Sequence, residues 1–394
     1  MILPNPVSQV GGYVMSIKVA HVVRQYRPSV GGMEDVVENI AQHQLKQSGQ
    51  LPVILTLDRL FRHADQNLPR NEVIEGIPIT RLSYRGSSRY PLCPEILKYV
   101  RDADVIHVHG IDFFFDFLAA TKPIHRRPMV VSTHGGYFHT RFASTLKQIY
   151  FHTATRLSSR AYDKVIATSM NDGDIFNKII PSSQGQIIEN GVNVDKYAGQ
   201  SASTSKPVLI YFGRWSENKG LLETIAFFKR LVSRHPEWKL IIAGREYDHT
   251  QSGLMAVLHQ HALTESVHLF PNPSDQELAS LIGQSSYFIC LSRHEGFGIA
   301  PIEAMSAGLT PVLSDIPPFS HLIRQAGMGI LLDGDPDSGM SALLELHTQS
   351  EFEQARRRAG LQAYSARYSW DRIADSYVDI YKSLCKPQTS RKAS

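Results

Sequence analysis

The sequence predicts an α/β protein built from two Rossmann-like domains, each with a parallel β-sheet. Short, continuously apolar runs alternate with helical patterns through most of the 394 residues. Such runs are typical of parallel strands that helices cover on both faces. The runs form two series, separated by a small, polar segment from Gly199 to Lys206. Each series is long enough for one domain of ordinary size.

The apolar runs give the expected strands. The first series comprises Ile17–Val23, Pro52–Leu57, Val105–Val108, Met129–Ser132, Lys164–Thr168 and Gln186–Ile188. The second comprises Val208–Phe212, Lys239–Ala243, Ser266–Phe270, Ser286–Leu291 and Thr310–Val312. Helical periodicity between them predicts helices over Met33–Lys46, Leu221–Ser233 and Asp275–Ile282, among others.

These patterns predict the division of the chain. We expect an N-terminal domain over residues 15–200, a C-terminal domain over 201–370, and a C-terminal helix and tail over 371–394 that cross back to the first domain. Residues 1–14 hold two prolines, a Gly-Gly and little periodicity, which predicts a disordered leader or a natural start at Met15.

The composition is that of an ordinary globular protein. A net charge of +4 is too small to indicate a nucleic-acid partner, and three scattered cysteines exclude a disulfide framework or a thiolate metal site. No apolar run approaches the roughly 20 residues that span a bilayer, and no cationic-then-apolar signal opens the chain. We therefore expect a protein of a reducing, cytoplasmic compartment.

The turn after the strand Val208–Phe212 places two cations close together. Gly213 to Gly220 reads GRWSENKG, with Arg214 and Lys219 five residues apart. Both could converge on one anion beside a helix N-terminus, as a diphosphate leaving group requires. The alternative is a pair of solvated loop cations.

A glycine-rich turn and a short helix follow the strand Ser286–Leu291. The segment from Glu295 to Glu303 reads EGFGIAPIE, and Gly296 and Gly298 would allow the backbone to approach a ligand closely. Glu295 lies in the loop and Glu303 in the helix, so the two carboxylates can reach different parts of one ligand. Carboxylates bind the vicinal hydroxyls of a ribose. The alternative for Glu303 is stabilisation of the helix dipole.

Together these two motifs resemble the retaining GT-B glycosyltransferases of family 4, over about Ile17 to Tyr381. The resemblance implies two domains that face each other across a cleft. It also implies donor-binding roles, in which Arg214 and Lys219 contact the diphosphate and Glu303 binds the ribose. The transferred sugar and the phosphate are held by Glu295 and by the amides of Phe297, Gly298 and Ile299. The chain departs from the family at Gly244–Tyr247, which many members replace with Gly-x-Gly-Pro. This segment borders the nucleobase in the family, so the base stays open.

Three features of the N-terminal half have counterparts in the same family. Gly31 and Gly32 open a helix and offer amides to a phosphate, although Gly-Gly is often only a turn. His134 follows the strand Met129–Ser132 and resembles the family's histidine near the transferred sugar, which makes it a catalytic candidate with Lys219 and Glu295. Ser169 ends the next strand and is a weaker donor-binding candidate. No GxGxxG follows any strand, which counts against a dinucleotide oxidoreductase.

We expect no metal requirement. Asp102 and Asp104 precede their strand instead of following it. His107 and His109 alternate with valine on a strand, which indicates packing or lining of the cleft more than metal ligation.

The stretch from Phe117 to Tyr162 contains no Asp or Glu but seven Lys and Arg residues interleaved with aromatics. This pattern suits an anionic, partly apolar membrane surface. We expect the membrane and acceptor surface to include Arg126, Arg127, Arg141, Lys147 and Arg156. Nucleic acid could produce the same pattern, and a solvated basic face is the other alternative.

Within the family, the segment from Thr133 to Arg156 looks like the mannosyltransferases of acetan- and xanthan-type exopolysaccharide assembly. That resemblance implies GDP-mannose as the donor, a polyprenyl-diphosphate oligosaccharide as the acceptor, and peripheral attachment to the inner face of the cell membrane. The alternatives are a family 4 enzyme with another sugar nucleotide, such as UDP-glucose, and a non-catalytic sugar-nucleotide sensor.

Overall fold

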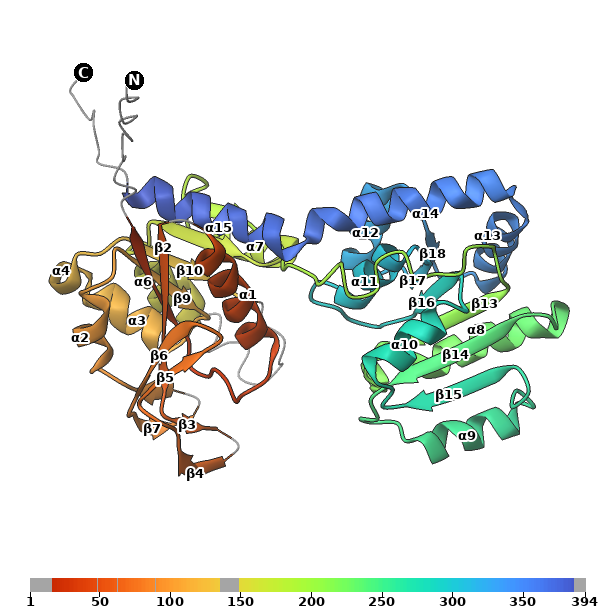
Figure 1. Cartoon of the computed structure of the whole chain (residues 1–394), viewed down its shortest axis with the longest axis horizontal. Coiled ribbons are helices and arrows are strands. Elements are labelled where there is room, and N and C mark those ends of the chain that lie inside the picture. Colours follow the sequence, from red (N-terminus) through yellow and green to blue (C-terminus); the bar gives the residue numbers. More distant parts are fainter. Residues whose placement is uncertain (1–15, 48, 62, 89, 135–148, 386–394) are drawn as a thin grey trace, which may run out of the picture. The chain divides into compact units, whose positions relative to one another are not determined.

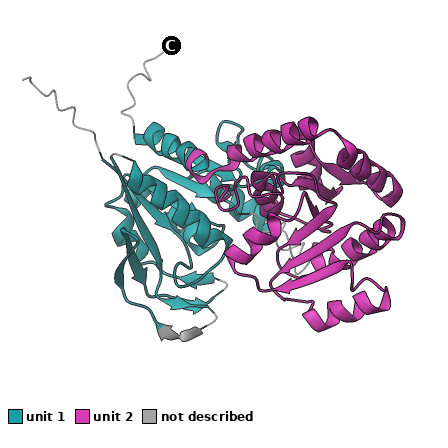
Figure 2. Ribbon diagram, turned by 45° about the vertical axis from the view of Figure 1, so that its right-hand side comes forward, with its two compact units in different colours: residues 1–190, 373–394 teal, residues 191–372 magenta. Residues whose placement is uncertain are grey.

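This computed structural model describes residues 16–385, apart from 48, 62, 89 and 135–148. The chain forms two compact units, of which unit 1 comprises residues 1–190 and 373–394 and unit 2 comprises residues 191–372 (Figure 2). The polar segment after Gly199 lies inside unit 2, because the amides of Gly199 and Ser201 donate to the carbonyls of Ser306 and Ala307. The expected leader, residues 1–14, lies outside the described residues.

Unit 2 is a doubly wound parallel sheet. Its strands are β13 (Val208–Phe212), β14 (Lys239–Gly244), β15 (Val267–Pro271), β16 (Tyr287–Cys290), β17 (Thr310–Ser314) and β18 (Ile330–Leu332). Their order in the sheet is β15-β14-β13-β16-β17-β18, and every pairing is parallel. The order reverses between β13 and β16, and ligands of such folds bind outside the carboxyl ends of the strands at this point.

Helices cover the sheet of unit 2 (Figure 1). They are α8 (Leu221–Arg234), α9 (Gln251–Gln260), α10 (Asp275–Ile282), α11 (Ile299–Ala307), α12 (Pro317–Ala326), α13 (Pro336–Thr348) and α14 (Glu351–Ser365). In α8 the buried residues Leu221, Thr224, Phe228 and Leu231 recur three or four positions apart and form one apolar face.

Unit 1 repeats this design. Its parallel strands are β1 (Ile17–Val22), β2 (Gln50–Leu57), β6 (Ile77–Leu82), β9 (Val105–His109), β10 (Met129–Ser132), β11 (Lys164–Ala167) and β12 (Gly185–Ile187). The sheet order is β12-β11-β10-β9-β1-β2-β6-β5, so the reversal lies between β1 and β9. The predicted α/β class with two parallel sheets is confirmed.

Helices lie on both faces of this sheet, and α1 and α3 take opposite faces (Figure 1). They are α1 (Gly32–Lys46), α2 (Ile96–Val100), α3 (Phe113–Ala120), α4 (Lys122–His125), α6 (Arg156–Ser159) and α7 (Met170–Phe176). Ala20 and Val22 of β1 pack in one core cluster with α3, whereas Val23 packs in another with Val37 of α1. Since side chains alternate along a strand, His21 lies on the α1 face.

Short antiparallel pairs in unit 1 do not follow from the apolar runs. They are β3 (Arg59–Leu60) with β4 (His63–Asn67), β5 (Asn71–Ile74) with β6, and β7 (Arg85–Ser87) with β8 (Tyr90–Leu92). Glu75 and Gly76 join β5 to β6 with positive φ angles of 49° and 83°. A two-residue turn of this kind twists as the flanking strands do.

The last helix, α15 (Trp370–Cys385), contributes its residues from Ile373 onward to unit 1. Its Tyr381 hydroxyl lies 2.7 Å from Nδ1 of His107, and both side chains are fully buried. This contact ties the end of the chain to the central strands of unit 1.

Candidate active site

Two loops meet at the carboxyl ends of β13 and β16 in unit 2, where the strand order reverses. The amide of Arg293 donates to the carbonyl of Asn218 at 2.9 Å, and the Asn218 amide group donates to the carbonyl of His294 at 2.7 Å. Gly220 has φ 65°, and a Cβ there would lie 1.9 Å from the carbonyl oxygen of Leu291. Only glycine allows this approach, which holds the GRWSENKG loop against the glycine-rich turn.

We therefore expect Gly220→Ala to destabilise unit 2 by more than about 1 kcal/mol, because the added Cβ meets both a positive φ and a backbone atom. Gly296→Ala is the matched control, since a Cβ at Gly296 meets nothing within 4 Å. Urea denaturation of both variants measures the difference. Equal stability of the two variants would contradict the close packing of the loops.

Lys219 and Glu295, predicted separately from two motifs, form an ion pair. The distance from Nζ to Oε1 is 2.6 Å, and the side chains are 20% and 12% exposed. The hydroxyl of Ser292 donates to the same carboxylate oxygen at 2.7 Å. Ser292 is a site residue that the sequence motifs did not single out; its position two residues after β16 is the signal that could have identified it.

Arg214 lies in the same loop as Lys219 but has different surroundings. Its side chain is exposed, and its guanidinium carbon lies 5.5 Å from the centre of the Tyr247 ring. A guanidinium on an aromatic face keeps its donors available for a phosphate. The loop thus presents one paired cation and one stacked cation.

The glycine-rich turn ends at the N-terminus of α11. Gly298 is the N-cap with φ 96°, no side chain caps the helix, and a Cβ there would lie 2.9 Å from the Phe319 ring. The first amides of a helix have no partners within the helix and favour an anion. The amides of Gly298 and Ile299 are therefore suited to a phosphate. Phe297 packs edge-on against Tyr368, which fixes the turn.

Glu303 lies within α11 and is largely shielded from water. Burial raises the pKa of its carboxyl group to about 7, Lys196 opposes this rise, and Asp275 adds to it. Lys196 pairs with Asp275 at 2.7 Å. The sequence motifs did not point to Lys196 or Asp275, which lie far from Glu303 in the chain.

In unit 1 the structure places Gly31 and Ser169 at the N-caps of helices, and Gly32 is the first residue of α1. Gly31 is the extended N-cap of α1, and a Cβ there would lie 2.7 Å from a carboxylate oxygen of Glu34. Ser169 is the N-cap of α7, and its hydroxyl accepts from the amide of Asp172 at 3.2 Å. These positions are those of residues that begin helices. That Gly31, Gly32 and Ser169 contact the donor stays a prediction.

His134 lies two residues after β10 and has φ 52°, a left-handed conformation that costs energy in a residue other than glycine. Burial lowers the pKa of its imidazole to about 4, so the ring is neutral near pH 7. Its Nε2 lies 3.1 Å from Nδ1 of His109. Strained residues and histidines with a shifted pKa gather at functional sites.

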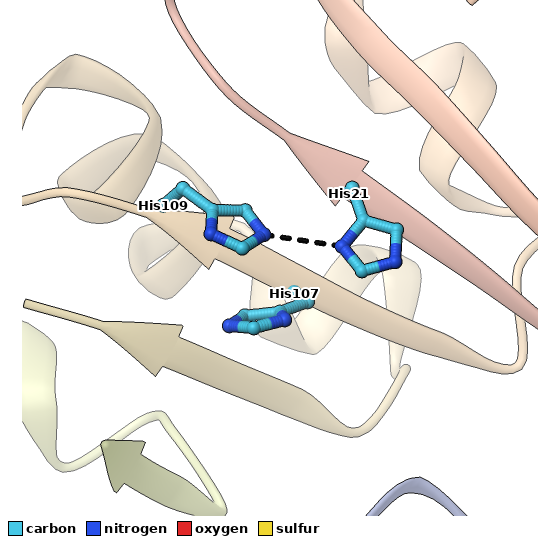
Figure 3. A group of neighbouring side chains, drawn as sticks. All are labelled: His21, His107 and His109. Carbon is cyan, nitrogen blue, oxygen red and sulfur yellow. Dashed lines mark hydrogen bonds between the residues drawn. The ribbon is translucent and has the colours of Figure 1, made fainter. Parts of the chain in front are cut away.

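Three buried histidines of unit 1 have the spacing of metal ligands. His21, His107 and His109 are the group of described residues whose nitrogens lie within 4.8 Å of one another (Figure 3). Each ring nitrogen nevertheless has a partner in the protein. His21 contacts Gln44 and His109, His109 contacts His21 and His134, and His107 contacts Tyr381 and Ser132. Hydrogen bonding accounts for all these nitrogens, so we assign the group no metal.

The predicted basic surface is described in part. Arg126 and Arg156 are exposed and Arg127 is half-buried, whereas Arg141 and Lys147 lie outside the described residues. Lys122 pairs with Asp163 at 2.7 Å, which neutralises one of the seven cations. Within the described part of the chain, no helix has both the length and the apolar character to cross a membrane.

Comparison with known proteins places these features in a family. The model for "Glycosyltransferase Family 4" matches residues 30–196, and that for "Glycosyl transferases group 1" matches residues 194–364. The GDP-mannose:cellobiosyl-diphosphopolyprenol α-mannosyltransferase of Xanthomonas campestris is 50% identical over 375 residues, which cover 95% of this chain and 99% of that protein. The protein of the same name from Komagataeibacter xylinus is 39% identical and covers 94% of each chain.

Solved structures show the same fold. A glycosyltransferase from Rickettsia africae superposes with a TM-score of 0.72 at 17% identity, covering 95% of this chain and 100% of that one. Anabaena Alr3699/HepE in complex with UDP gives 0.70 at 18% identity, covering 93% and 100%. The resemblance to GT-B glycosyltransferases is thereby confirmed, and the chain belongs to the glycosyltransferase family of these α-mannosyltransferases.

Proposed function

We propose that this chain transfers mannose from GDP-mannose, with retention of configuration, to a polyprenyl-diphosphate oligosaccharide such as cellobiosyl-diphosphopolyprenol. The names of the relatives that share up to 50% of its residues support this donor and this acceptor. The observation that carries the proposal is the arrangement of Lys219, Glu295 and the uncapped N-terminus of α11 at the switch point of unit 2. These groups offer a cation, a sugar-binding carboxylate and phosphate-binding amides.

In the proposed reaction, a hydroxyl oxygen of the acceptor forms a bond to the anomeric carbon of mannose as the bond to the β-phosphate oxygen breaks. The leaving GDP keeps the electron pair and takes the hydroxyl proton on a phosphate oxygen. Arg214, Lys219 and the amides of Gly298 and Ile299 stabilise the charge that develops on the diphosphate. Glu303 holds the ribose hydroxyls.

Unit 1 supplies the remaining proposed contacts. His134 and Ser169 are the candidates that touch the transferred sugar and donor, and the amides of Gly31 and Gly32 are the candidates for the phosphate. Glu34 lies over Gly31 and hydrogen-bonds Ser29 at 2.7 Å. Its carboxylate must therefore turn away when a diphosphate binds there.

The test is transfer of radiolabel from a panel of sugar nucleotides to a synthetic cellobiosyl-diphosphate lipid. We expect label from GDP-mannose, and not from UDP-glucose, to enter the organic phase, and the product to be α-linked. The diphosphate lipid without its disaccharide is the control acceptor. Label only from UDP-glucose would support the other donor, and binding without any transfer would support a sensor. We also expect transfer to survive EDTA, because protein cations and amides neutralise the diphosphate.

We further propose that unit 1 attaches reversibly to the inner face of the cell membrane, where the lipid acceptor resides, as part of exopolysaccharide synthesis. Exposed apolar side chains stand beside the exposed arginines. Leu157, which is 68% exposed, follows Arg156, and Ile124, which is 54% exposed, lies two positions before Arg126. Arginine beside an inserting apolar side chain suits an anionic leaflet, where each cation contributes about 1 kcal/mol.

This attachment predicts binding that depends on anionic lipid and on salt. Replacing Arg126, Arg156 and Arg160 with serine should release the protein from anionic vesicles, since exposed charges act within about 8–10 Å. The matched control replaces three exposed cations of unit 2, Lys229, Arg230 and Arg324, with serine. Vesicle flotation at low and high salt measures both. Equal binding to neutral and anionic vesicles would contradict the proposal.

A further inference from the structure

Four polar side chains form a continuous row in unit 1, and they come from four different elements. Nε2 of His21 on β1 lies 2.6 Å from Oε1 of Gln44 on α1. Nδ1 of His21 lies 3.1 Å from Nε2 of His109 on β9 (Figure 3), and Nδ1 of His109 lies 3.1 Å from Nε2 of His134 after β10. Gln44, His21 and His109 are fully buried.

The topology explains why the row exists. His21 and His107 are register partners on neighbouring parallel strands, so alternation along β9 places His109 on the same face, which is the α1 face. Gln44 reaches that face from α1. The row therefore crosses the switch point between β1 and β9 and ends at His134, the catalytic candidate.

Every ring in the row is neutral, so all the hydrogen bonds along the row must donate in the same direction. Burial lowers the pKa of His21 to about 4 and that of His109 well below its ordinary value. A neutral imidazole carries one N–H, so a ring that donates from one nitrogen must accept at the other. The orientation of one end of the row consequently fixes the tautomer of every ring.

Gln44 lies at one end of the row and determines the direction of its hydrogen bonds. Its amide nitrogen donates to Oε1 of Gln50 at 3.4 Å, which turns its carbonyl oxygen toward His21. An amide oxygen only accepts, so His21 donates from Nε2 and accepts at Nδ1. His109 then donates from Nε2 to His21, and His134 donates from Nε2 to His109.

We propose that Gln44, His21 and His109 are positioning residues that hold His134 as the Nε2-protonated tautomer, with an unprotonated Nδ1 that accepts a hydrogen bond from a hydroxyl of the transferred sugar. The role of this nitrogen toward sugar rests on the proposed function, whereas the tautomer itself does not. The opposite tautomer would present an N–H there, which donates to a hydroxyl oxygen instead of accepting from it. An orienting group behind a histidine performs this task in other active sites.

His107 provides a matched control. It lies on the same strand as His109, is fully buried and packs against His109 with ring centroids 3.9 Å apart. Its ring nitrogens, however, contact Ser132 at 2.9 Å and Tyr381 at 2.7 Å, so it makes no hydrogen bond to the row. Replacing the imidazole with a phenyl ring removes these two hydrogen bonds but keeps an aromatic ring against His109, so the hydrogen bonds of the row remain.

The direct test is long-range ¹H–¹⁵N spectroscopy of the ligand-free protein with ¹⁵N-labelled histidine, which distinguishes protonated from unprotonated ring nitrogens. The His134 signals are assigned by their loss in His134→Asn. We expect Nε2 of His134 to carry the proton. A proton on Nδ1 overturns the inference, whatever the enzyme transfers.

Substitutions test the cause. Gln44→Met keeps the size of the side chain but removes the acceptor, so the His134 signals should shift toward a mixture of tautomers. His107→Phe should leave the His134 tautomer unchanged. Transfer from GDP-mannose should fall roughly two- to tenfold in Gln44→Met, since the tautomer becomes mixed and not reversed.

The two proposals fail separately. An unchanged His134 tautomer in Gln44→Met, confirmed as folded by circular dichroism, overturns the positioning role even in an active mannosyltransferase. Absence of transfer in a wild-type protein whose His134 carries its proton on Nε2 instead overturns the proposed function and leaves the tautomer assignment intact.

Discussion

Replacing Lys219 with alanine is expected to lower the rate of sugar transfer at saturating donor by about a hundredfold or more. The ammonium group lies at the carboxyl end of the central strand β13, is largely shielded from water, and is held at 2.6 Å from Glu295 before any ligand binds. Charge that develops on a leaving diphosphate makes its interaction with Lys219 stronger in the transition state than in the bound substrate. Losing one such donor costs about 2.7–4 kcal/mol in comparable sites.

The effect should appear in turnover more than in donor affinity, because the interaction grows as the bond breaks. Lys229→Ala, which removes an exposed lysine of α8 in the same unit, is the control and should retain normal turnover. Single-turnover measurements with labelled GDP-mannose separate chemistry from product release. A Lys219→Ala enzyme with near-normal turnover would remove this residue from the diphosphate site.

Local sequence patterns predicted the parallel strands of both sheets apart from β6 and β18, because most buried parallel strands are continuous apolar runs. Met129–Ser132 and Val208–Phe212 were predicted with the bounds that the structure shows. The short strands β3, β7 and β8 lack that signal, since they lie in small antiparallel pairs and few of their residues are buried. Turn chemistry, not hydrophobicity, defines them.

In the candidate active site too, local patterns identified single residues but not the contacts between them. Lys219 and Glu295 could be found because each follows a strand, but their ion pair joins residues 76 positions apart, and no local pattern encodes it. His107 and His109 looked like one alternating pair, and their rings do pack together. Their hydrogen bonds differ, since His109 contacts His134 whereas His107 contacts Ser132 and Tyr381. Long-range contacts of this kind depend on strand order and register.

Replacing Glu303 with alanine is expected to weaken the binding of GDP and of GDP-mannose together, roughly 10- to 150-fold, which corresponds to the 1.5–3 kcal/mol of a hydrogen bond to a charged group. Glu295→Ala should instead lower turnover and leave GDP affinity nearly unchanged, because we assign Glu295 to the sugar, which GDP lacks. Isothermal titration calorimetry with GDP compares the two variants directly. Equal losses of GDP affinity would show that the roles of the two carboxylates are wrongly divided.

Glu303 also predicts how GDP binding depends on pH. Its pKa is raised to about 7 from an ordinary value of 4.5, so in the folded protein the carboxyl group is mostly protonated at pH 6 and mostly ionised at pH 8. Ribose hydroxyls donate hydrogen bonds, and the ionised carboxylate accepts them best. The affinity for GDP should therefore rise by up to about tenfold from pH 6 to pH 8 through this group.

The variant Glu303→Gln isolates this contribution, because the phosphates of GDP titrate identically against both proteins. Its affinity relative to that of the wild type should change with pH only through Glu303. Stability should show the opposite trend. Between about pH 4.5 and pH 7 the folded wild type binds a proton that the unfolded chain has released, so its free energy of unfolding should fall relative to Glu303→Gln as pH rises through this window. The contradicting outcome is that neither the ratio of GDP affinities nor the difference in free energy of unfolding between the two proteins changes from pH 5 to pH 8. Glu303 would then be ionised throughout this range, and its burial would not control nucleotide binding.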